Sequence, residues 1–244
     1  MLRTLALLLV RANHVVPLPT IVEELWGENP PRSAATTAQT YIYQLRRLVD
    51  DQAVAGPGKD FLATRAPGYV LRCAKERIDL FDFQRLTAEA QSLMDRDLPG
   101  PASVKLREAL ALWSGSPLAN VETGPVLEGY LASLEEQRIR ALNLRIEADL
   151  QLGRVHHLVE ELRSLVVEHP YNEWYHSLLI FSLARVGRRH DAMQAYARTR
   201  RVLSQDLGLT PSRELLRIIQ DVVLHDREER PPFPMPSSNE PRIA

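Results

Sequence analysis

The sequence predicts a mainly α-helical protein with a small N-terminal domain, residues 1–74, and a larger all-helical domain, residues 78–225. Two observations favour this division. Three short stretches of helical periodicity and a β-hairpin pattern fill the first 74 residues, whereas two glycine-centred helical motifs recur 34 positions apart in the rest of the chain. Residues 226–244 are rich in proline and charge, and we expect them to be disordered.

Three helices are expected in the first domain. Residues 1–10 carry leucines at helical spacing. The segment TIVE has the form of a capping box, in which Thr20 and Glu23 satisfy free backbone N–H groups, so we expect the second helix to begin there and to end at Gly27. Ser33 can cap the third helix. The apolar stripe of that helix is formed by Ala38, Ile42, Leu45 and Val49.

A β-hairpin follows the third helix. Alternating residues on either side of a Pro67-Gly68 turn predict one strand over Phe61–Thr64 and another over Tyr69–Cys73. Three helices with a short second connection, closed by a hairpin, form a winged helix-turn-helix.

The second domain repeats itself. The segments LGRVHHLVEEL and VGRRHDAMQAY have their glycines at positions 153 and 187, which is the spacing of tetratricopeptide repeats. Pro170 separates two helical pairs, and a last helix is expected over residues 213–224. The sequence therefore predicts a tetratricopeptide-like domain of stacked helical hairpins.

The third helix has an unusual polar face. A solvated helix face usually carries Glu and Lys, but this one carries Thr, Gln, Tyr and Arg. Amides of Gln can bind adenine edges and Thr methyls can contact thymine, so these side chains are suited to the major groove of DNA. A polar surface helix that binds nothing is the alternative. The candidate base-contacting residues are Gln39, Thr40, Tyr43 and Gln44.

Phosphate contacts are expected at both ends of the same helix. Thr36 and Thr37 lie near the N-terminus, where the helix dipole favours an anion. Arg46 and Arg47 lie at the other end and are suited to contact the DNA backbone. Arg65 lies beside the wing turn, from which it could enter a minor groove.

Charge and composition agree with a DNA-binding N-terminal domain in an intracellular protein. The net charge is −1, but residues 1–74 hold eight basic and six acidic side chains, a balance of +2, and form the only net-positive segment. One cysteine, Cys73, excludes an intrachain disulfide. Residues 1–10 imitate a signal peptide, which stays an alternative, although a buried helix is expected. No apolar run approaches the roughly 20 residues that a membrane helix needs.

No catalytic, cofactor or metal site is expected. The adjacent His156 and His157 point about 100° apart on a helix, which does not suit a shared metal. The segment GPGKD at Gly56 lacks the remaining residues of a phosphate-binding loop. Cys73 is expected to be a small apolar filler, so an enzyme is the disfavoured class.

The motifs together resemble the Streptomyces antibiotic regulatory protein (SARP) family. FLATRAPGYVLR is similar to the wing of OmpR-type DNA-binding domains. With it, ELWGENPPRSAATTAQTYIYQLRRLV, IDLFDFQRL and EALALWSGSPLANV extend the resemblance to most of the chain. The resemblance implies an OmpR-type winged helix followed by a bacterial transcriptional activation domain. By position, its DNA-binding roles fall on Thr36, Thr37, Gln39, Thr40, Tyr43, Gln44 and Arg65.

The resemblance also implies partners and a cellular role. Such a protein binds direct repeats near promoters of antibiotic biosynthetic clusters, as a dimer on DNA in the cytoplasm, and recruits RNA polymerase through its sigma factor. A tetratricopeptide-type adaptor without specific DNA binding is the alternative. A fragment ending near Arg77, supplied with whatever it needs to fold, is expected to retain DNA recognition.

The first helix raises a structural question. Members of the family have a small sheet before this helix, and here the chain starts at the helix, so we expect an N-terminally truncated domain that lacks the sheet. Residues 2–10 are apolar on more than one face, and a helix of that kind belongs inside a core. We therefore expect the first helix to need a further layer of cover, supplied by strands encoded upstream of Met1.

Overall fold

The computed structural model of the protein describes residues 1–52 and 61–224. The predicted loop around Gly56 and the predicted disordered tail, residues 226–244, lie outside this part of the chain. The fold consists of two compact units, Met1–Arg145 and a second from Ile146 onward. The division falls inside one long helix, α7 (Pro125–Gln151), and not at residues 75–77 between the two predicted domains.

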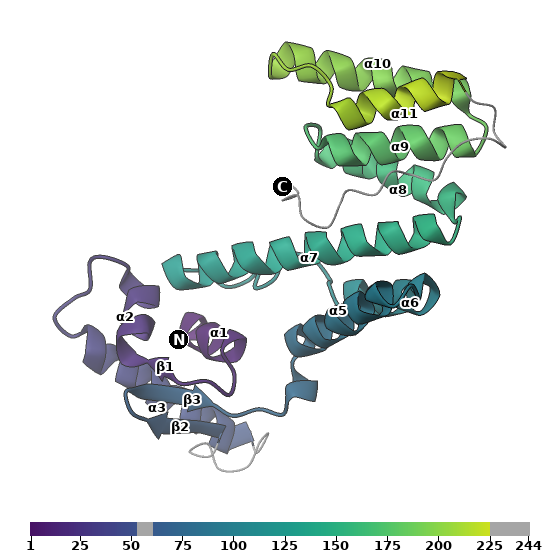
Figure 1. Ribbon diagram of the computed structural model, residues 1–244. Coiled ribbons are helices and arrows are strands. Elements are labelled where there is room, and N and C mark those ends of the chain that lie inside the picture. The colour runs from purple at the N-terminus through teal and green to yellow at the C-terminus, as the bar shows by residue number, and fades with distance from the viewer. Residues whose placement is uncertain (53–60, 225–244) are drawn as a thin grey trace. The chain divides into compact units, whose positions relative to one another are not determined.

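A winged helix-turn-helix forms the first part of unit 1, as predicted (Figure 1). Three helices lie beside a three-stranded antiparallel sheet of order β1-β3-β2. The hairpin is confirmed, but its turn lies one residue earlier than predicted, at Ala66-Pro67, because Gly68 is already in β3 and pairs with Arg65. The elements are α1 (Leu2–Val10), β1 (Val16–Pro17), α2 (Leu18–Trp26), α3 (Ala34–Gln52), β2 (Leu62–Arg65) and β3 (Gly68–Leu71).

The start of the second helix was predicted wrongly, and the strand before it was not predicted. Helix α2 begins at Leu18, where Pro17 has the extended backbone of an N-cap residue (φ −60°, ψ 145°) and no side chain caps the helix. Thr20 is already inside the helix, so the capping box does not form. Pro19 lies in the first turn, where proline is favoured because its φ is already helical and its missing N–H has no partner there, and this preference outweighs the Thr-Glu signal. Strand β1 lies so close to β3 that a Cβ on Gly68 would be 1.9 Å from the carbonyl oxygen of Val16.

Helix α1 is largely covered. Leu7 and Leu8 are fully buried in a cluster with residues from α2, α3 and the sheet. Part of the cover comes from the segment between α6 and α7, which contributes the partly buried Leu118 and Val121, and from the first turn of α7, which contributes the fully buried Leu127. The additional layer that the apolar first helix requires is thus supplied in part from more than 100 residues further along the chain.

A second cluster completes unit 1. Helices α5 (Asp79–Asp95) and α6 (Pro99–Ala111) pack against each other and against α7. Ala102, Leu106 and Ala109 of α6 are fully buried there, and the rings of Phe83 and Trp113 meet edge to face with centroids 5.2 Å apart.

Unit 2 confirms the repeat at the level of backbone geometry. Gly153 and Gly187 both have positive φ, 70° and 83°, which favours glycine. Around them the same backbone hydrogen bonds recur 34 residues apart, since the N–H of Arg154 donates to Asp149 O and that of Arg188 donates to Leu183 O. The helices of this unit are α8 (Val155–Glu168), α9 (Glu173–Arg185), α10 (Arg189–Asp206) and α11 (Arg213–Leu224).

The helix boundaries of unit 2 follow local capping. Asn172 caps α9 by accepting hydrogen bonds from the N–H groups of Trp174 and Tyr175. Helix α11 begins at Arg213, as predicted, where the Ser212 hydroxyl accepts from Leu215 N–H. Within residues 1–52 and 61–224, no helix is long and apolar enough to cross a membrane.

Candidate nucleic-acid interface

Helix α3 has the two faces that the sequence predicts, although Val49 of the predicted apolar stripe is only half-buried. Four side chains on one face are at most 5% exposed and pack into the core: Ala34, Ala38, Ile42 and Leu45. The opposite face is open, and Tyr43 is 60% exposed although its ring is large and mostly apolar. Thr37 is half-buried. The exposed polar side chains of this face are Thr36, Gln39, Thr40, Tyr43, Gln44 and Arg47.

Thr40 has a constrained hydroxyl group. Its Oγ1 donates to the carbonyl oxygen of Thr36 at 2.9 Å, one helical turn earlier. The single proton of the hydroxyl is committed to the helix, so the oxygen can only accept a hydrogen bond from a ligand. An acceptor at this position suits the exocyclic amino group of adenine or cytosine.

The N-terminal end of α3 provides donors. The helix begins at Ala34, directly after the predicted cap Ser33, and Thr37 N–H is bound to the Ser33 carbonyl oxygen at 2.9 Å. The first turn of a helix presents N–H groups outward together with the positive end of the dipole. Exposed Thr36 adds a hydroxyl at this end, so the arrangement is suited to a phosphate.

Arg46 is a structural clamp and not the free cation expected at this end of α3. Its Nε donates to the carbonyl oxygen of Leu62 at 2.7 Å and its Nη2 to Thr64 Oγ1 at 2.9 Å. The guanidinium also lies 5.8 Å from the centre of the Tyr69 ring. These contacts commit Arg46 to the wing, which leaves Arg47 as the exposed arginine of the pair.

The wing presents Arg65 on a defined face. Thr64 and Tyr69 are paired across the hairpin on the side that Arg46 contacts, and the adjacent Arg65 and Val70 therefore point to the other side. An open hollow of about 390 Å³ lies on that side. It is lined by Asn13, Arg65, Val70, Arg72, Cys73 and Ala74.

Asn13 fixes the floor of this hollow. Its Nδ2 donates to the Cys73 carbonyl oxygen at 2.9 Å, and its Oδ1 accepts from Cys73 N–H at 3.2 Å. Its own N–H donates to the carbonyl oxygen of Leu71 at 2.7 Å. The loop after α1 is thereby joined to the end of β3, and Cys73, half-buried and free, is a framework residue of the wing.

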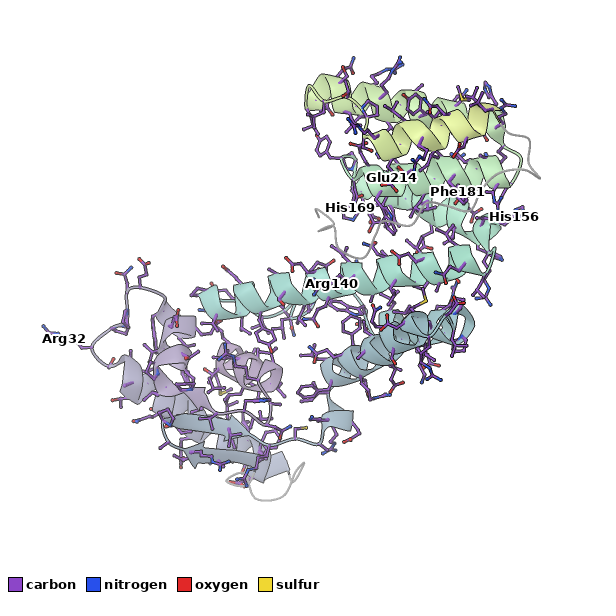
Figure 2. The ribbon with its side chains drawn as sticks, in the orientation of Figure 1. Arg32, Arg140, His156, His169, Phe181 and Glu214 are labelled. Carbon is purple, nitrogen blue, oxygen red and sulfur yellow. The ribbon has the colours of Figure 1, made fainter. Side chains whose placement is uncertain are left out.

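Two further arginines join the candidates. Arg72 lines the hollow with Arg65, and Arg32 projects outward from the α2–α3 loop just before the recognition helix (Figure 2). Four arginine side chains are exposed and make no hydrogen bond or ion pair in the described part of the chain: those of Arg32, Arg47, Arg65 and Arg72. Neither Arg32 nor Arg72 was among the DNA-binding residues predicted from the sequence. A basic residue immediately before a helix cap is the signal that could have found Arg32.

The described residues contain no grouping of three or more His, Cys, Asp and Glu side chains that could hold a metal ion. His176, the most buried histidine among those described, is engaged on both ring nitrogens, with Nε2 2.9 Å from the Pro170 carbonyl oxygen and Nδ1 2.9 Å from Thr199 Oγ1. Burial lowers the pKa of His176 from its ordinary value. It joins α9 to α10.

Two family models match the chain in sequence. Residues 2–71 match the C-terminal domain of transcriptional regulatory proteins, and residues 78–223 match the bacterial transcriptional activator domain. The first match covers α1 to β3, including α3 and the wing, and the second begins directly after η1 (Lys75–Arg77).

Relatives of the chain are named as regulators. The regulatory protein DnrI of Streptomyces peucetius is 38% identical over 224 residues, which are 91% of this chain and 82% of DnrI. The regulatory protein AfsR of Streptomyces griseus is 33% identical and covers 96% of this chain, but the chain spans only 23% of AfsR. The transcriptional regulator RedD of Streptomyces coelicolor is 31% identical, with coverage of 92% and 64%.

A solved structure has the same fold. EmbR of Mycobacterium tuberculosis, determined in complex with a low-affinity phosphopeptide, superposes with a TM-score of 0.81 at 28% identity, over 91% of this chain and 58% of EmbR. Three findings agree on one family. They are the match to an OmpR-type winged helix, the match to an activator domain over residues 78–223, and a relative, DnrI, that matches along most of its length. The chain belongs to the Streptomyces antibiotic regulatory protein family of transcriptional activators.

Proposed function

We propose that the protein activates an antibiotic or other secondary-metabolite gene cluster by binding direct repeats near its promoter and recruiting RNA polymerase. The observation that carries the proposal is the exposed face of α3, which holds amides, hydroxyls and one free arginine beside a wing with two free arginines. Tyr43, which is 60% exposed at the centre of this face, adds an aromatic ring that can contact a thymine methyl.

Sequence recognition is assigned to the middle of α3. Gln39 and Gln44 offer amides that can bind adenine bidentately, and Thr40 offers an acceptor. Tyr43 lies between them and can contact a thymine methyl with its ring. The four side chains lie on one exposed face, so they can enter one major groove together.

Anchoring to phosphates is assigned to the ends of the helix and to the wing. Thr36 and Thr37 contribute from the N-terminal turn, and Arg47 from the other end. Arg65 enters the minor groove next to the major-groove site. Arg32, on the loop before α3, is added to this group because it is exposed and unpaired in the described structure.

Activation is assigned to the helices after residue 77. They match the bacterial transcriptional activator domain and carry 19 basic against 21 acidic side chains over residues 75–225, so they are not suited to bind a polyanion as a whole. We assign them the contact with RNA polymerase through its sigma factor, with two protomers on DNA.

A footprint of the full chain on promoter fragments of antibiotic gene clusters tests the proposal. We expect protection of two copies of one short sequence in the same orientation, with an affinity that falls steeply as salt is raised. Purified RNA polymerase should then start transcription at that promoter only when the protein is present. Absence of salt-sensitive duplex binding would favour the adaptor alternative, and binding without activation would remove the polymerase contact.

A further inference from the structure

Helix α2 contains a buried carboxylate whose partners lie about 100 residues away. Glu24 is fully buried, although α2 is the first helix of the helix-turn-helix and Glu23 beside it is exposed. One oxygen of Glu24 accepts from Gly124 N–H at 2.6 Å, and the other accepts from Leu127 N–H at 2.8 Å. Both donors belong to the first turn of α7 or the residue before it, and all these residues lie in unit 1.

The contact has the chemistry of a helix cap supplied from elsewhere in the chain. The first N–H groups of a helix have no partner within the helix, and the dipole favours a negative charge there. Glu24 supplies two acceptors and the charge in one group. Because a buried carboxylate is costly unless it is fully hydrogen-bonded, removal of either partner leaves buried polar groups unsatisfied.

The backbone around the contact leaves no room for a side chain at Gly124. A Cβ there would lie 2.0 Å from the carbonyl oxygen of Glu24. Gly124 does not need a positive φ, so close approach alone requires glycine.

Arg3 ties a third segment to the same place. Its Nη1 donates to the carbonyl oxygens of Glu24 and Leu25, each at 3.2 Å, and its Nε donates to that of Glu122 at 2.7 Å. Its Nη2 also lies 3.0 Å from the Glu122 carboxylate. These polar contacts therefore join α1 to the end of α2 and to the residues just before α7. They lie beside the apolar cluster that contains Leu127.

We propose that Glu24 is a positioning residue for DNA recognition. It fixes α2 to the N-terminus of α7, so the working DNA-binding unit extends beyond the wing into the first turns of α7. This inference rests on the proposed function. Helix α2 packs against α3. A change in the position of α2 therefore changes the angle at which α3 enters the major groove of DNA. A fragment ending near Arg77 lacks the donors of this contact, so on this proposal it loses part of the DNA recognition that was expected of it from the sequence.

Glu24→Gln in the full chain tests the role, with Glu23→Gln as the matched control. The control removes the same charge from the same helix at an exposed position. Gln has one acceptor in place of two, so one N–H of α7 loses its partner. We expect exchange of the Gly124 and Leu127 amide hydrogens to rise at least about tenfold in Glu24→Gln and to stay unchanged in Glu23→Gln.

Comparison of the affinities for specific and for random DNA distinguishes a positioning role of Glu24 from a general loss of structure. Well below the unfolding midpoint, Glu24→Gln should weaken binding to the footprinted site by at least about fivefold while leaving binding to random duplex and its salt slope unchanged. Equal loss on both kinds of DNA, or faster exchange with unchanged specific affinity, would overturn the positioning role. Absence of specific binding by the wild-type protein would instead reject the proposed function.

Gly124→Ala disrupts the contact between Glu24 and the start of α7 by a change at the α7 end of the contact. It changes no residue of the winged helix, and it should reproduce the loss of specific affinity. The double variant with Glu24→Gln should be no weaker than the weaker single variant, because both remove one interaction. Additive losses would show that the two residues act independently and would refute the contact as the cause. Specific DNA should also slow exchange at Gly124 in the wild-type protein, since the coupling is reciprocal.

Discussion

Replacement of Arg46 by alanine should loosen the wing, although the neighbouring Arg47 can be removed without that effect. Arg46 joins α3 to β2 and β3 through two charged hydrogen bonds and one contact with the Tyr69 ring. In the register of the hairpin, the backbone N–H and C=O groups of Leu62 and Thr64 point away from β3, toward the free edge of β2. Because Arg46 binds the carbonyl oxygen of Leu62, it also covers part of this edge.

The magnitude follows from these contacts. A hydrogen bond to a charged group contributes about 1.5 to 3 kcal/mol when well buried, and an exposed cation–π contact about 0.5 to 1 kcal/mol. The guanidinium of Arg46 is partly exposed, which reduces each contribution. We therefore expect Arg46→Ala to lower the free energy of unfolding of unit 1 by about 2 kcal/mol. Arg46→Lys keeps the charge but cannot reach two acceptors in the same way, and should lose about half as much.

Urea unfolding and amide exchange at β2 and β3 measure the effect. Arg47→Ala is the control, since its side chain is exposed and unpaired in the described structure, and its stability should stay within about 0.5 kcal/mol of the wild type. Its cost should appear instead in DNA affinity. If Arg46→Ala were as stable as Arg47→Ala and exchanged no faster in the wing, the clamp would not contribute to the fold.

Three further outcomes are expected. Gln44→Ala should cost about 1 to 3 kcal/mol at one base position, whereas Arg47→Ala should weaken all sequences alike and reduce the salt slope by about one; equal effects of both on specific and random DNA would contradict this division. Arg65→Ala should reduce affinity chiefly at sites with a narrow A·T-rich minor groove, and equal loss at G·C-rich flanks in a binding titration would contradict it. Burial lowers the folded-state pKa of His176, so its neutral form is favoured by folding; stability is complete above the unfolded pKa near 6.5 and falls as pH decreases below it. Thermal unfolding from pH 7.5 to 5.5 should show this loss for the wild type and for the exposed His156→Gln, and a smaller one for His176→Gln.

Local signals predicted much of the fold. The bounds of α11, the hairpin and the two repeat glycines each depend on residues that are close together in the chain. The bounds of α11 and the two glycines are confirmed, and the hairpin is confirmed with its turn one residue earlier than predicted. The predicted start of α2 was wrong because two local signals competed, Pro19 in the first turn and Thr20 as a cap, and the proline prevailed. Strand β1 was missed because two residues carry no periodicity, and its pairing with β3 is made across about 50 residues of chain.

The polar face of α3 was predictable for the same reason, since helical periodicity assigns each of its residues to a side. The exposure of that face agrees with the prediction, while its contacts with DNA stay a prediction. The roles of Arg46 and Glu24 were not predictable, because a charged side chain at a given position looks the same whether it faces solvent or a partner distant in the sequence. Only the fold brings Leu62 to Arg46 and Gly124 to Glu24.

The arginines of the first domain fall into two groups, those that bind backbone carbonyl oxygens and those that are exposed and unbound in the described structure. Arg3 and Arg46 are committed to backbone carbonyls and cannot be released to a ligand without exposing those acceptors. The uncommitted arginines at the ends of α3 and on the wing, described above, remain available to phosphates. A polyanion would therefore bind where the free charges are, and the committed pair determines only how rigidly they are held. On this basis the loss of a free arginine should lower affinity for every sequence, and the loss of a committed one should lower discrimination between sequences.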